Sequence, residues 1–193
     1  MKIYLVRHGE SLGNKKQLCF GQTDYDLTEL GIIQAMEVQR KLECIPFSTC
    51  YTSNLCRAIH TATVILTSHS VPLYKDARLN EQYMGKFENV NGETLAERYP
   101  IEFEAMLENW ISNPPVDGEH FDEMYHRVQE IAEVILDNKT DVLVVAHNGP
   151  LAMLVVYLLG LPPVAVDNFY FDYGKYSVIE IHPWGKRLSR LNV

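Results

Sequence analysis

The sequence contains no long uninterrupted apolar segment. Its longest apolar stretch, residues 151–161, is well short of the roughly 20 residues that a membrane-spanning helix needs. The apolar run near the N-terminus, residues 3–6, is too short for the hydrophobic region of a secretory signal. We therefore expect a cytoplasmic protein with no membrane partner.

Positive charge and paired cysteines are also scarce. Lys and Arg number 17 against 25 Asp and Glu, which gives a net charge of −8. Because a protein that grips a phosphate backbone needs a basic surface, we expect no nucleic-acid partner. The four cysteines contain no Cys-x-x-Cys pair, so a zinc site is not expected, and free thiols are favoured over a disulfide.

Motifs of several large enzyme classes are absent. The sequence has no His-Glu-x-x-His, no Gly-x-Ser-x-Gly, no Gly-x-Gly-x-x-Gly and no Walker A loop. These absences argue against a zinc peptidase, a serine hydrolase of the α/β type, a dinucleotide-binding enzyme and a P-loop NTPase. We therefore expect chemistry that uses neither a metal nor an organic cofactor.

The sequence does have a globular composition and a regular alternation of short apolar runs with amphipathic stretches. Hydrophobic residues make up 47% of the 193 residues, which is ordinary for a folded chain, and we expect one domain over residues 1–193. The apolar runs predict strands, the last two of them at the sheet edge, over residues 3–6, 49–52, 72–74, 142–146, 177–181 and 188–191. Helical spacing of apolar residues predicts helices over residues 28–43, 54–67, 121–135 and 150–159.

This order predicts an α/β fold. Strands that alternate with helices form a three-layer sandwich, with a mainly parallel central sheet and helices on both faces. Residues 77–118 lack a clear strand pattern and carry polar helical pieces at 94–98 and 103–110. We expect residues 82–118 to form a small inserted helical cap.

Two histidines directly follow predicted strands. Arg7 and His8 come after the predicted strand at 3–6, and His147 comes after the apolar strand at 142–146. Because ligands of such folds bind beyond the carboxyl ends of the strands, we expect these side chains to share a site. A neutral imidazole is a competent nucleophile toward phosphorus, so His8 is the candidate nucleophile.

Further residues supply the other parts of phosphoryl transfer. Arg7 and Arg57 would hold phosphoryl oxygens through their planar guanidinium groups, and His147 would donate a further hydrogen bond. Glu81 is the candidate that protonates the leaving group and then activates water. Each of these residues alone has an ordinary structural explanation, as a helix cap or a surface charge. Their combination at two strand ends favours chemistry.

The same residues lie in motifs that resemble the histidine phosphatase superfamily, the phosphoglycerate mutase-like family. The matching segments span the chain in the family's order: Leu5-Val6-Arg7-His8-Gly9-Glu10-Ser11 with Asn14, the run Ser53 to Ala62, Leu79 to Gly85, Gly118-Glu119, and Val144 to Gly149. The resemblance implies that His8 is phosphorylated, that Arg7, Arg57 and His147 form the phosphate pocket, and that Glu81 is the proton donor. It also implies that the substrate side is lined by Asn14, Phe20, Gly21, Gln22, Asn148 and Gly149.

The resemblance leaves three kinds of enzyme open. A short chain favours a phosphatase over the longer mutases of the family, and the pattern is most similar to the branch that hydrolyses α-ribazole 5′-phosphate in cobalamin synthesis. A phosphoglycerate mutase and a broad-specificity sugar or nucleotide phosphatase are the alternatives. Many members carry an arginine shortly after the second histidine motif, where this chain has Pro150-Leu151-Ala152, which argues against phosphoglycerate. We expect a small phosphorylated metabolite as partner and either a monomer or a homodimer.

Overall fold

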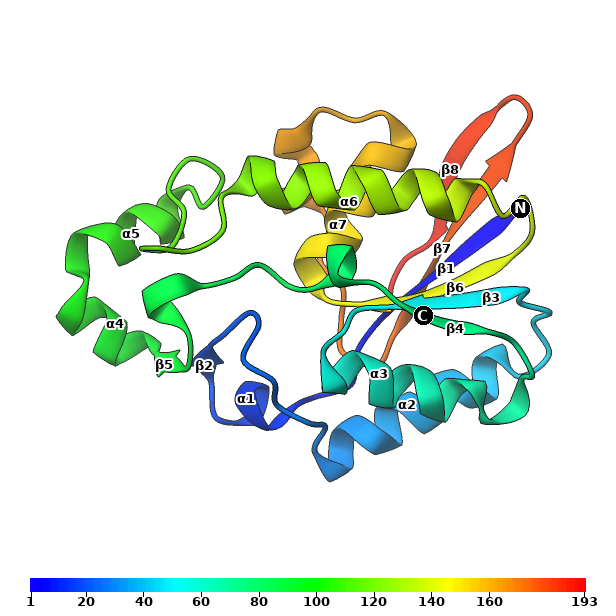
Figure 1. The fold of residues 1–193 in the computed structure, drawn as a ribbon, viewed down its shortest axis with the longest axis horizontal. Helices are drawn as coiled ribbons and strands as arrows, with labels where there is room; N and C mark the ends of the chain where they lie inside the picture. Colours follow the sequence, from blue (N-terminus) through cyan, green and yellow to red (C-terminus); the bar gives the residue numbers. More distant parts are fainter.

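The computed structural model describes residues 1–193 and contains a six-stranded sheet between two layers of helices (Figure 1). The strands, in chain order, are β1 Lys2–Arg7, β3 Thr49–Thr52, β4 Leu73–Lys75, β6 Val142–Ala146, β7 Tyr176–His182 and β8 Gly185–Arg190. They lie in the order β4-β3-β6-β1-β7-β8. The first four run parallel to one another, β7 runs antiparallel to its neighbour β1, and β8 runs antiparallel to β7. The predicted α/β sandwich with a mainly parallel sheet is confirmed.

Alternating side chains of the sheet enter two separate cores. Ile3 and Leu5 of β1 pack with the helices α6, Phe121–Leu136, and α7, Asn148–Leu159. Tyr4 and Val6 of the same strand pack on the other face, against the helices α2, Glu29–Leu42, and α3, Cys56–Ile65. This alternation follows from the two-residue period of a strand, and it places helices on both faces of the sheet, as Figure 1 shows.

The sequences of α6 and α7 explain how these two helices pack. Helix α6 buries a stripe at helical spacing that includes Met124, Val128 and Ile131, and Asp122 and Glu123 in its first turn suit the positive end of the helix dipole. Helix α7 is apolar nearly all round because it lies inside the larger core. No helix is both long enough and apolar enough to cross a lipid bilayer.

Several predicted boundaries were wrong. Helix α7 begins at Asn148, before the predicted start at Pro150, because a proline in the first turn has no N–H that the helix would use. The predicted helix at 54–67 ends as an α-helix at Ile65 and continues as a short 3-10 helix. Of the two strands that were predicted at the sheet edge, β7 lies inside the sheet, and β8 begins earlier than predicted, at Gly185.

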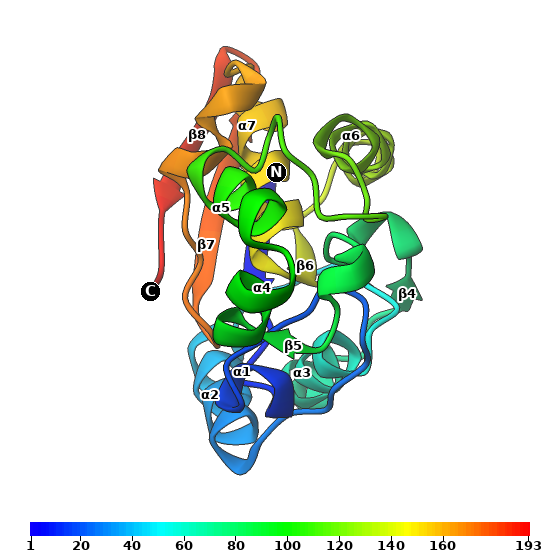
Figure 2. The ribbon, with the colours of Figure 1, turned by 90° about the vertical axis from the view of Figure 1, so that its left-hand side faces the viewer.

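Residues 82–118 lie outside the main sheet and project from one side of it (Figure 1), the side that faces the viewer in Figure 2. This segment, called the arm below, contains α4, Gly92–Arg98, and α5, Pro100–Glu108, which begins and ends earlier than the helical piece predicted at 103–110. It also contains a two-residue strand that was not predicted, β5 Val90–Asn91, which pairs with β2 Leu18–Cys19 beside the short helix α1, Leu12–Lys15. A pair of two-residue strands has too little alternation to be read from sequence. The division of the chain into a single domain with an inserted cap stays a prediction.

Candidate active site

The two strand-end histidines lie side by side. Strands β1 and β6 are parallel neighbours in which Arg7 is paired with Ala146, so the next residue of each strand, His8 and His147, emerges at the same edge. The centroids of the two imidazole rings are 4.9 Å apart, and the backbone N–H of His8 donates to the carbonyl of Ala146 at 3.1 Å. The convergence that the sequence predicted is therefore present in the structure.

A backbone hydrogen bond fixes the tautomer of His8. Its Nδ1 lies 2.7 Å from the carbonyl oxygen of Gly9, and because a carbonyl can only accept, Nδ1 carries the proton and Nε2 keeps its lone pair. His8 as a whole is only 3% exposed. Burial, followed by the charges of Arg57 and Arg7, holds the pKa of His8 well below the ordinary histidine value. His8 therefore presents a neutral, nucleophilic Nε2.

Two buried arginines flank the histidines without any carboxylate partner. Arg7 donates through Nη1 to the carbonyl of Phe171 at 2.6 Å, and its guanidinium lies 3.8 Å from the ring centroid of Tyr173. Arg57 donates to the carbonyls of Thr23 and Gly21 at 3.1 and 2.6 Å. No salt bridge involves either arginine. A buried cation that lacks a counter-ion favours an anionic ligand.

Unsatisfied polar atoms concentrate at this place. Four buried side-chain nitrogen or oxygen atoms in the chain have no hydrogen-bond partner, and three of them are Nε of Arg7, Nε of Arg57 and Nδ1 of His147. Because a buried polar atom without a partner is costly, these three atoms indicate a position that a polar ligand fills. Arg7, His8, Arg57 and His147 are called the His8 cluster below.

His147 is held by Ser53 from the end of the neighbouring strand. Its Nε2 lies 2.8 Å from the hydroxyl oxygen of Ser53, which also accepts the backbone N–H of Leu55 at 3.3 Å. If the hydroxyl donates to Nε2, the proton of the ring is on Nδ1, the atom without a partner. Burial, with Arg57, His8 and Arg7, holds the pKa of His147 well below its ordinary value, so the ring is neutral.

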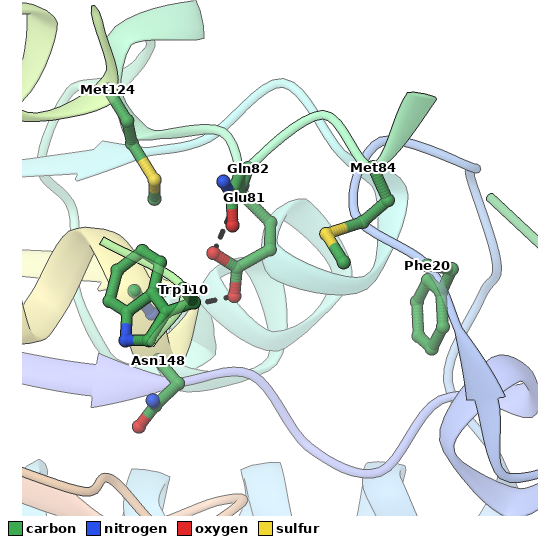
Figure 3. Close-up of a pocket in the computed structure, with 8 residues that line it drawn as sticks. Phe20, Glu81, Gln82, Met84, Trp110, Met124 and Asn148 are labelled. Carbon is green, nitrogen blue, oxygen red and sulfur yellow. Dashed lines mark hydrogen bonds between the residues drawn. The ribbon is translucent and has the colours of Figure 1, made fainter. Parts of the chain in front are cut away.

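Glu81 approaches the cluster from a loop rather than from a strand. It follows the 3-10 helix Ala77–Leu79, and its carboxylate accepts the backbone N–H groups of Gln82 at 3.1 Å and Gly149 at 3.5 Å (Figure 3). Gly149 is in the first turn of α7, and a Cβ there would lie 2.6 Å from Oε1 of Glu81. A glycine is therefore needed for the carboxylate to reach the start of this helix.

A hollow of about 250 Å³ opens beside Glu81 (Figure 3). It is called the Trp110 pocket below, and its walls are Phe20, Glu81, Gln82, Met84, Trp110, Met124, Asn148 and Gly149. A second hollow of about 190 Å³ shares Trp110, Asn148 and Gly149 with it. The indole N–H of Trp110 donates to Asp167 at 2.7 Å, and its ring meets the ring of Phe121 edge to face. The pocket thus combines apolar walls with a single carboxylate and no cation.

The residues that sequence reasoning assigned to the substrate side have different positions. Phe20, Asn148 and Gly149 line the Trp110 pocket. Gly21 uses its carbonyl to hold Arg57, and Gln22 donates its amide to the carbonyl of Glu81 at 3.3 Å. The side-chain oxygen of Asn14 accepts from Ser11 within the cap of α1. Contacts between any of these residues and a substrate stay predictions.

Sequence reasoning missed a carboxylate that holds two loops together. Glu88 accepts the backbone N–H groups of Gly21, Gln22 and Thr23 and that of Met84, at 2.8 to 3.1 Å. Burial acts to raise the pKa of Glu88. The hydrogen bond from the Thr23 hydroxyl, together with these backbone hydrogen bonds, outweighs burial and holds the pKa below its ordinary value. Nothing in the polar segment around this residue marks it in the sequence. Tyr173, which stacks on Arg7, and Trp110 were likewise not among the predicted site residues.

No group of three or more His, Cys, Asp and Glu side chains is arranged to hold a metal ion. The side chains that converge at the strand ends are instead two neutral imidazoles and two guanidinium groups with unused donors. This set has the chemistry that is needed to hold a phosphoryl group and to attack it. The Glu81 carboxylate lies near it, at the backbone N–H of Gly149, two residues after His147.

Comparisons with known proteins agree with that chemistry. The family model of the histidine phosphatase superfamily, branch 1, matches residues 3–193. An adenosylcobalamin/α-ribazole phosphatase of Escherichia coli is 31% identical over 100% of this chain and 96% of that protein, and a 2,3-bisphosphoglycerate-dependent phosphoglycerate mutase of Lachnoclostridium phytofermentans is 31% identical over 98% and 90%. The crystal structure of the α-ribazole phosphatase from Shigella flexneri superposes with a TM-score of 0.94 at 30% identity, over 100% of this chain and 96% of that one. With its family motifs spread over the whole length and its fold shared with such enzymes, the chain belongs to the histidine phosphatase superfamily and is a phosphatase.

Proposed function

We propose that the chain hydrolyses a small phosphomonoester without a metal, by transferring the phosphoryl group to Nε2 of His8 and then to water. One observation carries this proposal. The bond from Nδ1 of His8 to the Gly9 carbonyl leaves Nε2 unprotonated, in a buried place where two arginines and His147 have unused donors. Positioning and charge stabilisation are most of what phosphoryl transfer requires from a protein.

In the first step, Nε2 of His8 forms a bond to phosphorus while the ester bond to the leaving oxygen breaks. Arg7, Arg57 and His147 hold the three phosphoryl oxygens, and protonated Glu81 gives its proton to the departing alkoxide, which leaves as an alcohol. In the second step, the Glu81 carboxylate takes a proton from water as the water oxygen attacks phosphorus. The bond from phosphorus to His8 breaks, and inorganic phosphate is released.

The neutral state of both histidines supports this sequence of steps. A protonated His8 would have no lone pair, and a positive His147 would add a third buried cation beside Arg7 and Arg57. Burial and the two arginines hold both histidine pKa values well below the ordinary value, so both rings are neutral at neutral pH. The positive charge that the phosphate needs comes from the arginines, which cannot lose it.

We propose α-ribazole 5′-phosphate as the substrate. The full-length similarity to α-ribazole phosphatases of two bacteria supports this choice, and so do the apolar side chains of Phe20, Met84, Trp110 and Met124 in the Trp110 pocket. These side chains suit a flat, uncharged aromatic group beyond the ribose. The walls contain no cation for the carboxylate of a phosphoglycerate, which argues against the mutase activity of other relatives.

We also propose that the enzyme works in the cytoplasm as a monomer or homodimer and binds no nucleic acid. Its four cysteines are free thiols, one of them exposed, which suits a reducing compartment, and its net charge of −8 repels polyanions. Light scattering of the purified protein should give the mass of one chain, 22.1 kDa, or twice that value. A larger assembly, or retention on immobilised DNA at physiological salt, would contradict this part of the proposal.

The central test traps the intermediate and then compares substrates. With labelled phosphate ester, wild-type protein should yield an acid-labile phosphoprotein that His8→Ala cannot form, and His8→Ala should lose at least roughly 10³-fold in kcat/KM. His126→Ala, which removes an exposed histidine from α6, should behave as wild type. Full hydrolysis by His8→Ala would overturn the mechanism.

A panel of esters assayed in the presence of chelator then tests the substrate. We expect the highest kcat/KM for α-ribazole 5′-phosphate, above the monophosphoglycerates, sugar phosphates and nucleotides. Interconversion of the two monophosphoglycerates that is faster than phosphate release would instead identify a mutase. A flat profile over the panel would identify a broad-specificity phosphatase.

A further inference from the structure

Arg127 of α6 ties the loop of Glu81 to the body of the protein. Its guanidinium donates to both carboxylate oxygens of Glu119, Nε at 2.6 Å and Nη2 at 2.8 Å. The remaining donors reach backbone carbonyls, Nη1 to Arg78 at 2.7 Å and Nη2 to Glu81 at 3.3 Å. One side chain thus holds both the start and the end of the segment that leads from the 3-10 helix to Glu81.

Glu119 holds the same loop on the other side of Glu81. Its carboxylate accepts the backbone N–H of Tyr83 at 3.2 Å, and its own N–H donates to the carbonyl of Tyr83 at 2.8 Å. Its carbonyl accepts the side-chain amide of Gln82 at 2.8 Å. The residues before and after Glu81 are therefore fixed by one ion pair between Glu119 and Arg127, which is largely shielded from solvent, with side chains 14% and 17% exposed.

The carboxylate of Glu81 itself has little to hold it. It forms no salt bridge, and its two hydrogen bonds, from Gln82 and Gly149, are 3.1 and 3.5 Å long. Its position is consequently set by its backbone, which receives hydrogen bonds from Arg127 and from Gln22. A proton donor must reach the leaving oxygen within hydrogen-bond distance, so small errors in that backbone matter.

From these contacts we infer that Arg127 and Glu119 are positioning residues for the proton transfer by Glu81. The inference rests on the proposed role of Glu81. It assigns to the ion pair a function beyond stability, because its contacts reach the backbone of the acid itself, of Arg78 before it and of Tyr83 after it. Arg187 and Glu180 on the far hairpin form a comparable Arg–Glu contact, but that arginine is 58% exposed and donates to no backbone carbonyl.

Two substrates of similar size separate positioning from stability. Benzyl phosphate has a poor leaving group that needs a proton, whereas the leaving group of p-nitrophenyl phosphate departs without one. We expect Arg127→Ala and Glu119→Gln to lower kcat/KM for benzyl phosphate by roughly 10- to 100-fold and for p-nitrophenyl phosphate by less than about threefold. The ratio kcat/KM reports the steps up to phosphoenzyme formation, so the later role of Glu81 with water does not mask the difference.

Three further variants complete the design. Glu81→Gln should show the same dependence on the leaving group to at least the same extent. Arg187→Ala should leave kcat/KM for both substrates unchanged. Arg127→Lys keeps the charge but loses the planar guanidinium with its paired donors, and it should recover part of the activity toward benzyl phosphate. Should Arg127→Ala fail to fold, Glu119→Gln, which preserves the shape of the side chain, supplies the answer.

The outcomes distinguish this inference from the function on which it rests. Equal losses with both substrates in the Arg127 and Glu119 variants would show a purely structural pair and overturn the inference alone. The same holds if Glu81→Gln depends on the leaving group but these variants do not. If Glu81→Gln itself shows no such dependence, the role proposed for Glu81 fails and the inference fails with it.

Discussion

The His8 cluster and the Trp110 pocket are built from different kinds of structure. The four side chains of the cluster stand at strand ends and in the first turn of α3, and none is more than 8% exposed. The pocket is walled mainly by loops and by the arm, through half-buried side chains such as Phe20, Met84 and Trp110. In the proposed mechanism, side chains on the sheet and on α3 bind the phosphoryl group, which every ester shares. Side chains on loops contact the leaving group, which differs between esters.

The largest expected effect comes from removing a cation of the cluster. Arg57→Ala deletes a guanidinium that also holds the carbonyls of Gly21 and Thr23, so it removes both charge and the support of the loop. We expect kcat/KM to fall by roughly 10³-fold for every ester, because the lost contacts are to the shared phosphoryl group. Steady-state assays with α-ribazole 5′-phosphate and β-glycerophosphate check this. A loss confined to one ester would erase the contrast between cluster and pocket.

A smaller and selective effect is expected at the pocket. Trp110→Ala removes the largest apolar wall and should raise KM for α-ribazole 5′-phosphate by about tenfold, the equivalent of one aromatic stacking contact. β-Glycerophosphate, which has no aromatic group, should be hydrolysed as before. Trp110→Phe keeps a ring but loses the bond to Asp167, and it serves as the matched control. Equal losses with the two substrates would mean that Trp110 supports the fold rather than the leaving group.

The smallest expected effect is on stability and concerns the neutral histidines. The pKa values of His8 and His147 are lowered in the folded protein, mainly by burial. At acidic pH the unfolded chain therefore binds more protons at these two residues than the folded chain does. The contribution of the two neutral histidines to the free energy of unfolding is fully present above the ordinary histidine pKa of about 6.5 and is lost as pH falls below it. Urea midpoints at pH 7 and pH 5.5 should show a decrease that His8→Asn/His147→Asn reduces. An unchanged decrease in that variant would assign it to other groups.

Sequence reasoning found the His8 cluster more completely than the pocket, for a physical reason. Buried strands are continuous apolar runs, and the residues after them must meet at one edge of a parallel sheet, so Arg7-His8 and His147 could be placed together before any coordinates. Trp110 lines the pocket because of the path that its polar segment takes, and that segment has no periodicity from which the path could be predicted. Glu88 is placed by hydrogen bonds from backbone N–H groups, which any carboxylate can accept. Such positions depend on loop geometry, which the sequence does not encode in a readable pattern.

The pairing of β2 with β5 has a consequence for how this protein can change over evolutionary time. The two strands, together with Glu88, fix Phe20 and Met84 to each other just before α4 begins at Gly92. Residues 92–108 lie beyond this fixed point, so we expect changes there to alter the far wall of the pocket more than Phe20 or the His8 cluster. We therefore expect related chains to differ in substrate mainly through the sequence of α4 and α5, while the side chains proposed to transfer the phosphoryl group stay the same.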